Sequence, residues 1–251
     1  MKKLDFEISE LEPVIDWNYF YFAWSMGGKP REEKEKLREE AQEILASWRG
    51  KYHSHALLAV MQANADGDDI VMEGNLRFPM LRQQHPTAPG EPNLCLADYL
   101  RPLESGVPDQ MGVFCTTVDG IILEEYIHDE YLHMMAQTLS DRLAEATAEK
   151  LTRDHYHGIR PAIGYPSLPD TSANFIIDRI LDMRQVGIRL TESGMMTPHA
   201  SISGLMFAHP KARYFELGKI GDDQLRDYAR RRGVPVEMMR RFLQSSLIKK
   251  Q

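Results

Sequence analysis

The sequence predicts an α+β fold: a single domain in which antiparallel hairpins are flanked by helices, including one long central helix. Some stretches carry apolar residues at helical spacing, and others are short β-prone runs separated by turn residues. No Gly-x-Gly-x-x-Gly follows a predicted strand, so a Rossmann core is not expected. We therefore expect one domain over residues 1–251 that ends in a pair of helices at 222–247.

The composition is that of an ordinary globular protein. Of its 251 residues, 43% are hydrophobic and 27% are charged. The formal net charge of −7 disfavours binding to nucleic acid or anionic membranes, and no apolar run is long enough to span a bilayer. The chain turns acidic directly after Lys3, unlike a signal peptide, and its two cysteines form no Cys-x-x-Cys pair. These features predict a cytoplasmic protein with no membrane or nucleic-acid partner.

The first predicted elements are an aromatic run and an amphipathic helix. Residues 17–24 are mostly aromatic and are expected to pack in the core. Asp16 precedes them, where a carboxylate either caps a turn or faces a cationic ligand. Apolar residues recur at helical spacing over 31–48, between Pro30 and Gly50, which predicts a surface helix.

The central part of the chain is predicted to supply the strands. Residues 55–63 and 70–78 are expected to form a hairpin, because the Asn-Ala-Asp-Gly-Asp-Asp connection at 64–69 favours a turn. A short helix is expected at 94–100, and a further strand at 111–118.

A helix over about 121–150 is the longest predicted element. It contains two Glu-x-x-His motifs, at 125–128 and 130–133, which resemble half-sites of di-iron bundles. On one helix the two motifs would point about 140° apart, so we expect no metal site. Glu145 lies later in this helix among small residues, where it either approaches a ligand or pairs with Arg142 on the surface.

A proline-rich loop at 157–170 separates this helix from the next. Its three prolines exclude a helix and restrict the backbone. Arg160 suits a carboxylate or phosphate, and Tyr165 offers a ring face to a cation or a flat base. The loop is therefore either a rigid connector or part of a binding site.

The last third of the chain is predicted to contain a helix and a second hairpin. Thr171 or Ser172 can cap a helix that ends at Gly187. Strands at 200–208 and 213–220 are expected to pair across the turn between them.

The final helices, at 222–232 and 236–247, are rich in arginine. The residues concerned are Arg226, Arg230, Arg231, Arg232, Arg240 and Arg241. Two helices across a short turn allow a helix-turn-helix that binds DNA. The acidic net charge favours the alternatives, which are a solvated face, arginines at a helix C-terminus, or a docking site for an acidic protein.

Taken together, these segments resemble the activation domain of cobalamin-dependent methionine synthase, which binds S-adenosylmethionine (AdoMet). The most specific segment is Gly-Ile-Arg-Pro-Ala-Ile-Gly-Tyr-Pro at 158–166, which is similar to the family's Arg-Pro-Ala-x-Gly-Tyr-Pro signature. Supporting segments occur in the family's order at 15–17, 66–70, 94–98, 141–146, 190–193, 203–210 and 227–233.

The resemblance implies an AdoMet site in this chain. The residues at the family's AdoMet-contacting positions are Asp16, Glu145, Arg160, Ala162, Gly164, Tyr165 and Tyr214. Their chemistry suits the ligand, because carboxylates can meet its ammonium or ribose hydroxyls, an arginine its carboxylate, and tyrosine rings its sulfonium.

The resemblance also implies a reaction in which this chain positions a methyl donor. In the family, an electron donor reduces inactive cob(II)alamin and AdoMet methylates the cobalt. The leaving group is a neutral thioether, so no side chain has to transfer a proton and we expect no catalytic residue or metal ligand. Modules for homocysteine, methyltetrahydrofolate and cobalamin are absent from the sequence. We expect a reactivation subunit that acts in trans on a cobalamin-binding methionine synthase, with a flavodoxin-like electron donor.

Two departures from the family pattern leave a second function open. Residues 151–154 lead almost directly into the loop, where the family has a longer stretch with a Trp-Gly-Tyr element. Thr197 stands before Pro198, where the family has tryptophan. Both concern the surface that meets cobalamin, so the alternative is an AdoMet-binding or interaction protein that has lost the cobalamin-facing role. DNA binding by the final helices is a third hypothesis.

Overall fold

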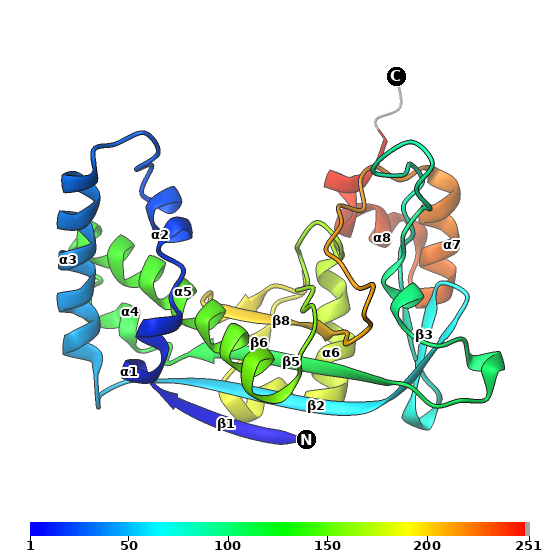
Figure 1. Cartoon of the computed structure of the whole chain (residues 1–251), viewed down its shortest axis with the longest axis horizontal. Helices are drawn as coiled ribbons and strands as arrows, with labels where there is room; N and C mark the ends of the chain where they lie inside the picture. The colour runs from blue at the N-terminus through cyan, green and yellow to red at the C-terminus, as the bar shows by residue number, and fades with distance from the viewer. Residues whose placement is uncertain (249–251) are drawn as a thin grey trace.

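The computed structural model describes residues 1–248 and confirms the α+β class (Figure 1). The strands are β1 (Lys2–Glu7), β2 (His53–Asp66), β3 (Asp69–Met72), β4 (Leu76–Pro79), β5 (Gln110–Val118), β6 (Arg189–Leu190), β7 (Met196–Thr197) and β8 (Ser201–Met206). The α-helices are α1 (Ile8–Leu11), α2 (Trp17–Ala23), α3 (Arg31–Trp48), α4 (Ile122–Glu125), α5 (Glu130–His155), α6 (Asn174–Leu181), α7 (Asp222–Arg232) and α8 (Val236–Phe242).

One antiparallel sheet of six strands organises the molecule. Its main path is β4-β3-β2-β5-β8, and β1 pairs with the first part of β2. The long strand β2 joins the two parts of the sheet, because residues 54–62 pair with β5 and residues 63–66 pair with β3. In Figure 1, α2 and α3 stand at one end of this sheet and α7 and α8 at the other.

Alternating side chains bury both faces of the sheet. Leu57, Cys115 and Leu205 belong to the apolar cluster that includes α6. Their neighbours Leu58 and Phe114 belong to the cluster that includes α1, α3 and α5. Because successive strand residues point to opposite faces, β2 and β5 are apolar on both sides, and the sheet lies between two helical layers.

A third, smaller apolar cluster holds α7 and α8 together. It contains Leu225, Tyr228 and Met239 from the helices, Leu243 directly after α8, and Leu217 from the segment before the helices, all of them buried. The predicted pair of C-terminal helices is therefore present, although α8 ends at Phe242 rather than near Leu247.

The predicted first hairpin is confirmed, but its return strand is divided. Asp66 pairs with Asp69 across the turn Gly67-Asp68, and Gly67 has a φ of 60° that glycine tolerates best. The predicted strand at 70–78 consists of β3 and β4, which pair antiparallel around a turn at 73–75. Gly74 has a φ of 73° there, so the chain reverses where one strand was expected.

The long helix begins later than the sequence predicted. Asp129 interrupts it, because its backbone is extended and its carboxylate accepts a hydrogen bond from the backbone N–H of Leu132 at 2.9 Å. The first Glu-x-x-His motif is therefore split, with Glu125 at the end of α4 and His128 in the connection, and the assumption that both motifs share one helix was wrong. At its other end, α5 continues to His155.

The predicted second hairpin is wrong. β8 pairs with β5 on one side, and its other edge is covered by the proline-rich loop rather than by residues 213–220. Those residues form an irregular segment whose apolar side chains Leu217 and Ile220 pack into the cluster of α7 and α8. The sequence pattern could not indicate that these side chains pack against the C-terminal helices rather than pairing with β8.

Three smaller predictions also change. The segment 94–100 contains a 3-10 turn at 96–99. The helix after the loop is capped by Asp170, one residue earlier than expected, and is divided into a 3-10 turn, α6 and a second 3-10 turn that stops at Gly187 as predicted. Strand β1 was not predicted, because Phe6 is its one buried side chain and its alternation is weak.

Most of the arginines in α7 and α8 are paired with carboxylates of this chain. Arg231 contacts Asp69 at 2.5 Å and Arg232 contacts Asp170 at 2.5 Å, and both side chains are largely buried. Similar pairs are Arg226–Asp222, Arg230–Asp227 and Arg240–Asp222, each at 2.6 Å. Arg231 and Arg232 therefore hold α7 to the rest of the molecule, Arg240 joins α8 to α7, and the pairs of Arg226 and Arg230 lie within α7.

None of the helices in residues 1–248 has the length and apolar content needed to cross a membrane.

A clamped histidine ties β1 to β2 and makes stability depend on pH. His55 contacts Asp5 at 2.6 Å through Nδ1 and Asp119 at 3.0 Å through Nε2. Burial opposes the charged imidazole, but the two carboxylates outweigh burial and raise the pKa of His55 above its ordinary value of 6.5. The protonated form is therefore stabilised in the folded state.

We expect the free energy of unfolding to fall as pH rises from below 6.5 through the raised pKa of His55, because the contribution of the charged clamp is lost over that window. Urea denaturation at a series of pH values from about 5.5 to 9 measures this effect. The variant His55→Gln should lose this component of the pH dependence. An identical pH profile in wild type and variant would contradict the prediction.

Candidate functional site

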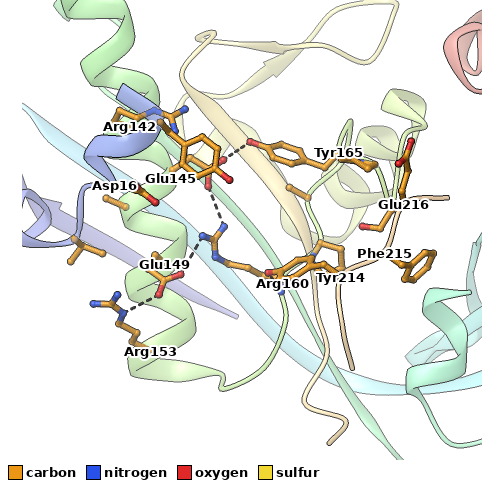
Figure 2. Close-up of a pocket in the computed structure, with 17 residues that line it drawn as sticks. Asp16, Arg142, Glu145, Glu149, Arg153, Arg160, Tyr165, Tyr214, Phe215 and Glu216 are labelled. Atoms are coloured by element: carbon orange, nitrogen blue, oxygen red, sulfur yellow. Dashed lines mark hydrogen bonds and ion pairs between the residues drawn. The ribbon is translucent and has the colours of Figure 1, made fainter. Parts of the chain in front are cut away.

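A cavity of about 810 Å³ opens where α2, α5, the loop at 157–170 and the segment at 214–216 meet (Figure 2). Its charged lining residues are Asp16, Glu145, Glu149, Glu216, Arg142, Arg153 and Arg160. Its aromatic lining residues are Tyr19, Tyr165, Tyr214 and Phe215. The structure thus brings together every residue predicted for the AdoMet site except Gly164.

Helix α5 supplies one wall of the cavity. Glu145 and Glu149 lie one turn apart on the same face, as residues four positions apart do in a helix. Arg142 does not pair with Glu145, the surface arrangement considered from the sequence, and instead lies over the ring of Tyr19, 5.7 Å from its centroid. This leaves Glu145 to face the cavity.

The proline-rich loop supplies the opposite wall and is fastened to β8 by its backbone. Ile159 and Phe207 exchange hydrogen bonds of 3.0 and 2.9 Å. Further along, the N–H of Leu205 donates to Pro161 at 3.1 Å, and the N–H of Ile163 donates to Ser203 at 2.9 Å. The loop therefore runs as an additional edge of the sheet, which fixes the position of the residues between these contacts.

Two glycines allow the loop to approach this closely. A Cβ on Gly158 would collide with the carbonyl oxygen of Phe207. A Cβ on Gly204 would collide with the carbonyl oxygen of Pro161 and lie 2.9 Å from the Cα of Ala162. Both positions therefore require a residue without a side chain.

Gly164 shapes the loop without lining the cavity. Its φ of 87° lies in the region that favours glycine, and its N–H donates to the carbonyl of Leu168 at 2.8 Å. Leu168 in turn donates to Tyr165 at 2.9 Å, which closes a tight turn. The turn directs the Tyr165 ring toward α5 (Figure 2).

Arg160 connects the two walls. Its guanidinium donates to Glu145 at 3.2 Å and to Glu149 at 3.3 Å, and its backbone N–H donates to the hydroxyl of Tyr214 at 2.9 Å. Figure 2 shows the guanidinium between the two glutamates. The side chain of Arg160 is only 17% exposed, so solvent screens the attraction in these ion pairs less than in pairs on the open surface.

Tyr165 also binds Glu145, from the other side. Its hydroxyl donates a hydrogen bond to the Glu145 carboxylate. Burial, followed by the negative charge of Glu145, raises the pKa of Tyr165, so the phenol stays protonated and remains a donor at neutral pH. Glu145 is thus held by Arg160 and Tyr165 together.

Asp16 begins α2 and lines the cavity at the same time. Its carboxylate accepts a hydrogen bond from the N–H of Asn18 at 2.9 Å, which confirms the helix-cap interpretation. Within residues 1–248, one carboxylate oxygen accepts this bond and no hydrogen bond reaches the other. That second oxygen is available to a ligand in the cavity.

Ala162 contributes backbone rather than side chain. The residue is 4% exposed and lines the cavity. Its carbonyl accepts a hydrogen bond of 3.3 Å from Tyr165, but its N–H has no partner among the residues that the structure describes. Buried backbone donors are nearly always paired, so an unpaired one at a cavity wall points to a ligand or a water molecule.

Several lining residues were not predicted from the sequence. Glu149 and Arg153 could have been found, because they follow Glu145 along one helical face. Phe215 and Glu216 could not, because no sequence pattern at 213–220 indicates that this segment borders a cavity. Among residues 1–248, no group of three or more His, Cys, Asp or Glu side chains is arranged to hold a metal ion.

Comparison with known proteins gives consistent results. The family model described as vitamin B12 dependent methionine synthase, activation domain, matches residues 7–154 and 149–233. The two matched segments meet at 149–154, where the sequence shows the shortened connection. A crystal structure of the MetH reactivation domain bound to AdoHcy superposes with a TM-score of 0.88 at 31% identity, over 99% of this chain and 90% of that one. The chain therefore belongs to the family of vitamin B12 dependent methionine synthase activation domains.

Proposed function

We propose that this chain binds AdoMet in the cavity and presents its methyl group to the cobalamin of a separate methionine synthase or a related corrinoid protein. The carrying observation is that Glu145, held by Arg160 and Tyr165, lines the same cavity as Asp16 and as Ala162 with its unpaired N–H. The similar reactivation domain is bound to AdoHcy, which is AdoMet without its methyl group. The cavity volume lies within the range of roughly 300–1,000 Å³ that is typical of small-molecule sites.

The anionic part of AdoMet is assigned to Arg160. A guanidinium has several N–H donors in a planar fork, and Arg160 uses one on each terminal nitrogen at distances above 3 Å. It can therefore bind the ligand carboxylate while Glu145 and Glu149 hold its position. The unpaired N–H of Ala162 can donate to an adenine nitrogen.

The cationic part of AdoMet is assigned to the carboxylates and tyrosines. Asp16 offers a free carboxylate oxygen to the ammonium group or a ribose hydroxyl. The rings of Tyr165 and Tyr214 offer their faces to the sulfonium, an interaction that requires no proton transfer. These assignments rest on charge complementarity and on the position of each group at the cavity wall.

The chemistry assigned to this chain is positioning. The partner's cobalamin, reduced by an electron donor such as a flavodoxin-like protein, supplies the nucleophile. When AdoMet gives up its methyl group, the product that remains is AdoHcy, a neutral thioether. The chain's own residues hold the methyl donor in line for transfer. A cytoplasmic setting, in which AdoMet and such a donor are both available, belongs to the same proposal.

Two measurements test this function in sequence. Isothermal titration calorimetry with AdoMet should give a saturable, one-site isotherm. Addition of the chain, AdoMet and a reductant to a cobalamin-binding methionine synthase that lacks its own activation domain should then form methylcobalamin. Formation is followed by the absorbance spectrum of the corrin and by transfer of label from methyl-labelled AdoMet.

The second result also decides between the proposal and its alternative. Thr197, in place of the family's tryptophan, is exposed on β7 and lies outside the cavity lining, which favours an AdoMet-binding protein without the cobalamin-facing role. Saturable AdoMet binding without any methylcobalamin formation would support that alternative. Absence of AdoMet binding would contradict both.

A further inference from the structure

The far end of the loop at 157–170 terminates in a buried carboxylate. Asp170 is 0% exposed, and one of its oxygens accepts hydrogen bonds from the N–H of Ser172 at 2.9 Å and from the Ser172 hydroxyl at 2.6 Å. Its other oxygen accepts from the Tyr228 hydroxyl at 2.8 Å and from Arg232 at 2.5 Å. Burial of a carboxylate is costly unless its oxygens are hydrogen-bonded and paired with a cation, as they are here.

Both partners of the second oxygen come from one face of α7. Tyr228 and Arg232 are four residues apart, and Arg232 also donates to the Tyr228 hydroxyl at 2.9 Å and lies over the Tyr228 ring at 5.5 Å. Arg232 further donates to the backbone carbonyl of Ser172 at 3.2 Å. The network is closed, because each of its charged groups is paired within it.

A second contact fastens the middle of the loop to the same part of the molecule. The N–H of Leu217 donates to the carbonyl of Pro166 at 2.9 Å. Leu217 is 2% exposed and packs in the apolar cluster of α7 and α8. Residues 214–216, directly before it, line the cavity. The cluster of α7 and α8 therefore supports two of the segments that form the cavity wall.

From these contacts we infer that Tyr228 and Arg232 are positioning residues for the AdoMet site, although neither lines the cavity. They hold Asp170, and Asp170 holds the loop that carries Arg160, Ala162 and Tyr165. The inference rests on the proposed function for the identity of the ligand. It assigns the C-terminal helices a role inside this molecule, distinct from the DNA-binding role considered from the sequence.

The variant Tyr228→Phe tests the inference most cleanly, because it removes one hydroxyl and leaves the Asp170–Arg232 ion pair in place. We expect AdoMet affinity, measured by calorimetry, to fall by about threefold to tenfold, the equivalent of one net hydrogen bond. Hydrogen exchange at the amides of Gly164 and Leu168, which close the loop turn, should become faster. The variant Arg232→Met should have a larger effect than Tyr228→Phe in both measurements. The effect of Arg232→Lys should lie between those of wild type and Arg232→Met.

The matched control is Tyr126→Phe, the same chemical change at a tyrosine between α4 and α5. Its hydroxyl accepts a hydrogen bond from Trp48 at 2.9 Å and is not part of the cavity. We expect wild-type AdoMet affinity and wild-type exchange at Gly164 and Leu168 for this variant. A general loss of stability would affect Tyr126→Phe and Tyr228→Phe alike, whereas a positioning role affects only the latter.

Wild-type affinity together with wild-type exchange in Tyr228→Phe would overturn the inference. A wild-type chain that does not bind AdoMet would instead contradict the proposed function. In that case, unchanged exchange at Gly164 and Leu168 in Tyr228→Phe would still overturn the role of α7 in holding the loop.

Discussion

Replacement of Arg160 by alanine is expected to weaken AdoMet binding by about 2 kcal/mol or more, which is roughly 30-fold in the dissociation constant. The variant loses the donors assigned to the ligand carboxylate. It also removes the cation that Glu145 and Glu149 share at 3.2 and 3.3 Å. Glu149 keeps its pair with Arg153, but Glu145 loses its ion pair, so the ligand carboxylate would meet the negative charge of Glu145. Calorimetric titration of wild type and variant measures the difference directly.

Two controls isolate the carboxylate contact. Arg153 lines the same cavity and pairs with Glu149 at 3.0 Å, but its side chain is 61% exposed, so Arg153→Ala should change affinity by no more than about threefold. On the ligand side, 5′-methylthioadenosine lacks the carboxylate and should bind wild type and Arg160→Ala with similar affinity. Equal AdoMet affinity in wild type and Arg160→Ala would remove the role assigned to this arginine.

The second large effect is expected at Gly204, where a methyl group has no room. In Gly204→Ala the new Cβ would collide with the Pro161 carbonyl, lie 2.9 Å from the Cα of Ala162 and 3.0 Å from the ring of Phe114. We expect the free energy of unfolding to fall by about 2–3 kcal/mol, since overpacked interiors have to displace backbone or side chains. AdoMet binding should weaken as well, because the displaced segment carries Ala162.

Gly27 provides the matched control for this substitution. A Cβ at Gly27 meets no atom within 4 Å, so Gly27→Ala should leave stability within about 0.5 kcal/mol of wild type. Urea denaturation of both variants separates the steric effect at Gly204 from the general effect of replacing glycine by alanine. Wild-type stability and affinity in Gly204→Ala would show that the loop does not lie against β8 as described.

Much of the fold was predictable because local sequence is sufficient for elements with strong patterns. The helix at 31–48 was predicted with the bounds of α3, and the turn at 64–69 correctly indicated a hairpin. The errors occurred where a local signal was overridden. Asp129 begins α5 inside a stretch predicted as one continuous helix, because its carboxylate caps the N–H of Leu132. Residues 213–220 took their partner from the C-terminal helices rather than from β8.

In the candidate site, too, some residues were predictable from local sequence and others only from the tertiary structure. A contiguous motif carries Arg160, Ala162, Gly164 and Tyr165, so a family resemblance could name them without any structure. Residue type alone left Asp16 and Glu145 undecided between surface and site. The structure gives Asp16 both a helix cap and a place in the cavity, and it replaces the Arg142–Glu145 pair by the contacts of Glu145 with Arg160 and Tyr165.

Local sequence thus specified the elements with strong patterns, such as α3 and the turn at 64–69, and the residues that belong to the family motif. Tertiary contacts alone decided that the loop joins the edge of β8, that Glu216 lines the cavity, and that α7 fastens Asp170. The physical reason is the separation along the sequence over which each interaction acts. Helix periodicity, capping and turn preference act over a few neighbouring residues, whereas the ion pair of Asp170 and Arg232 joins groups 62 positions apart and forms only when the whole core is assembled.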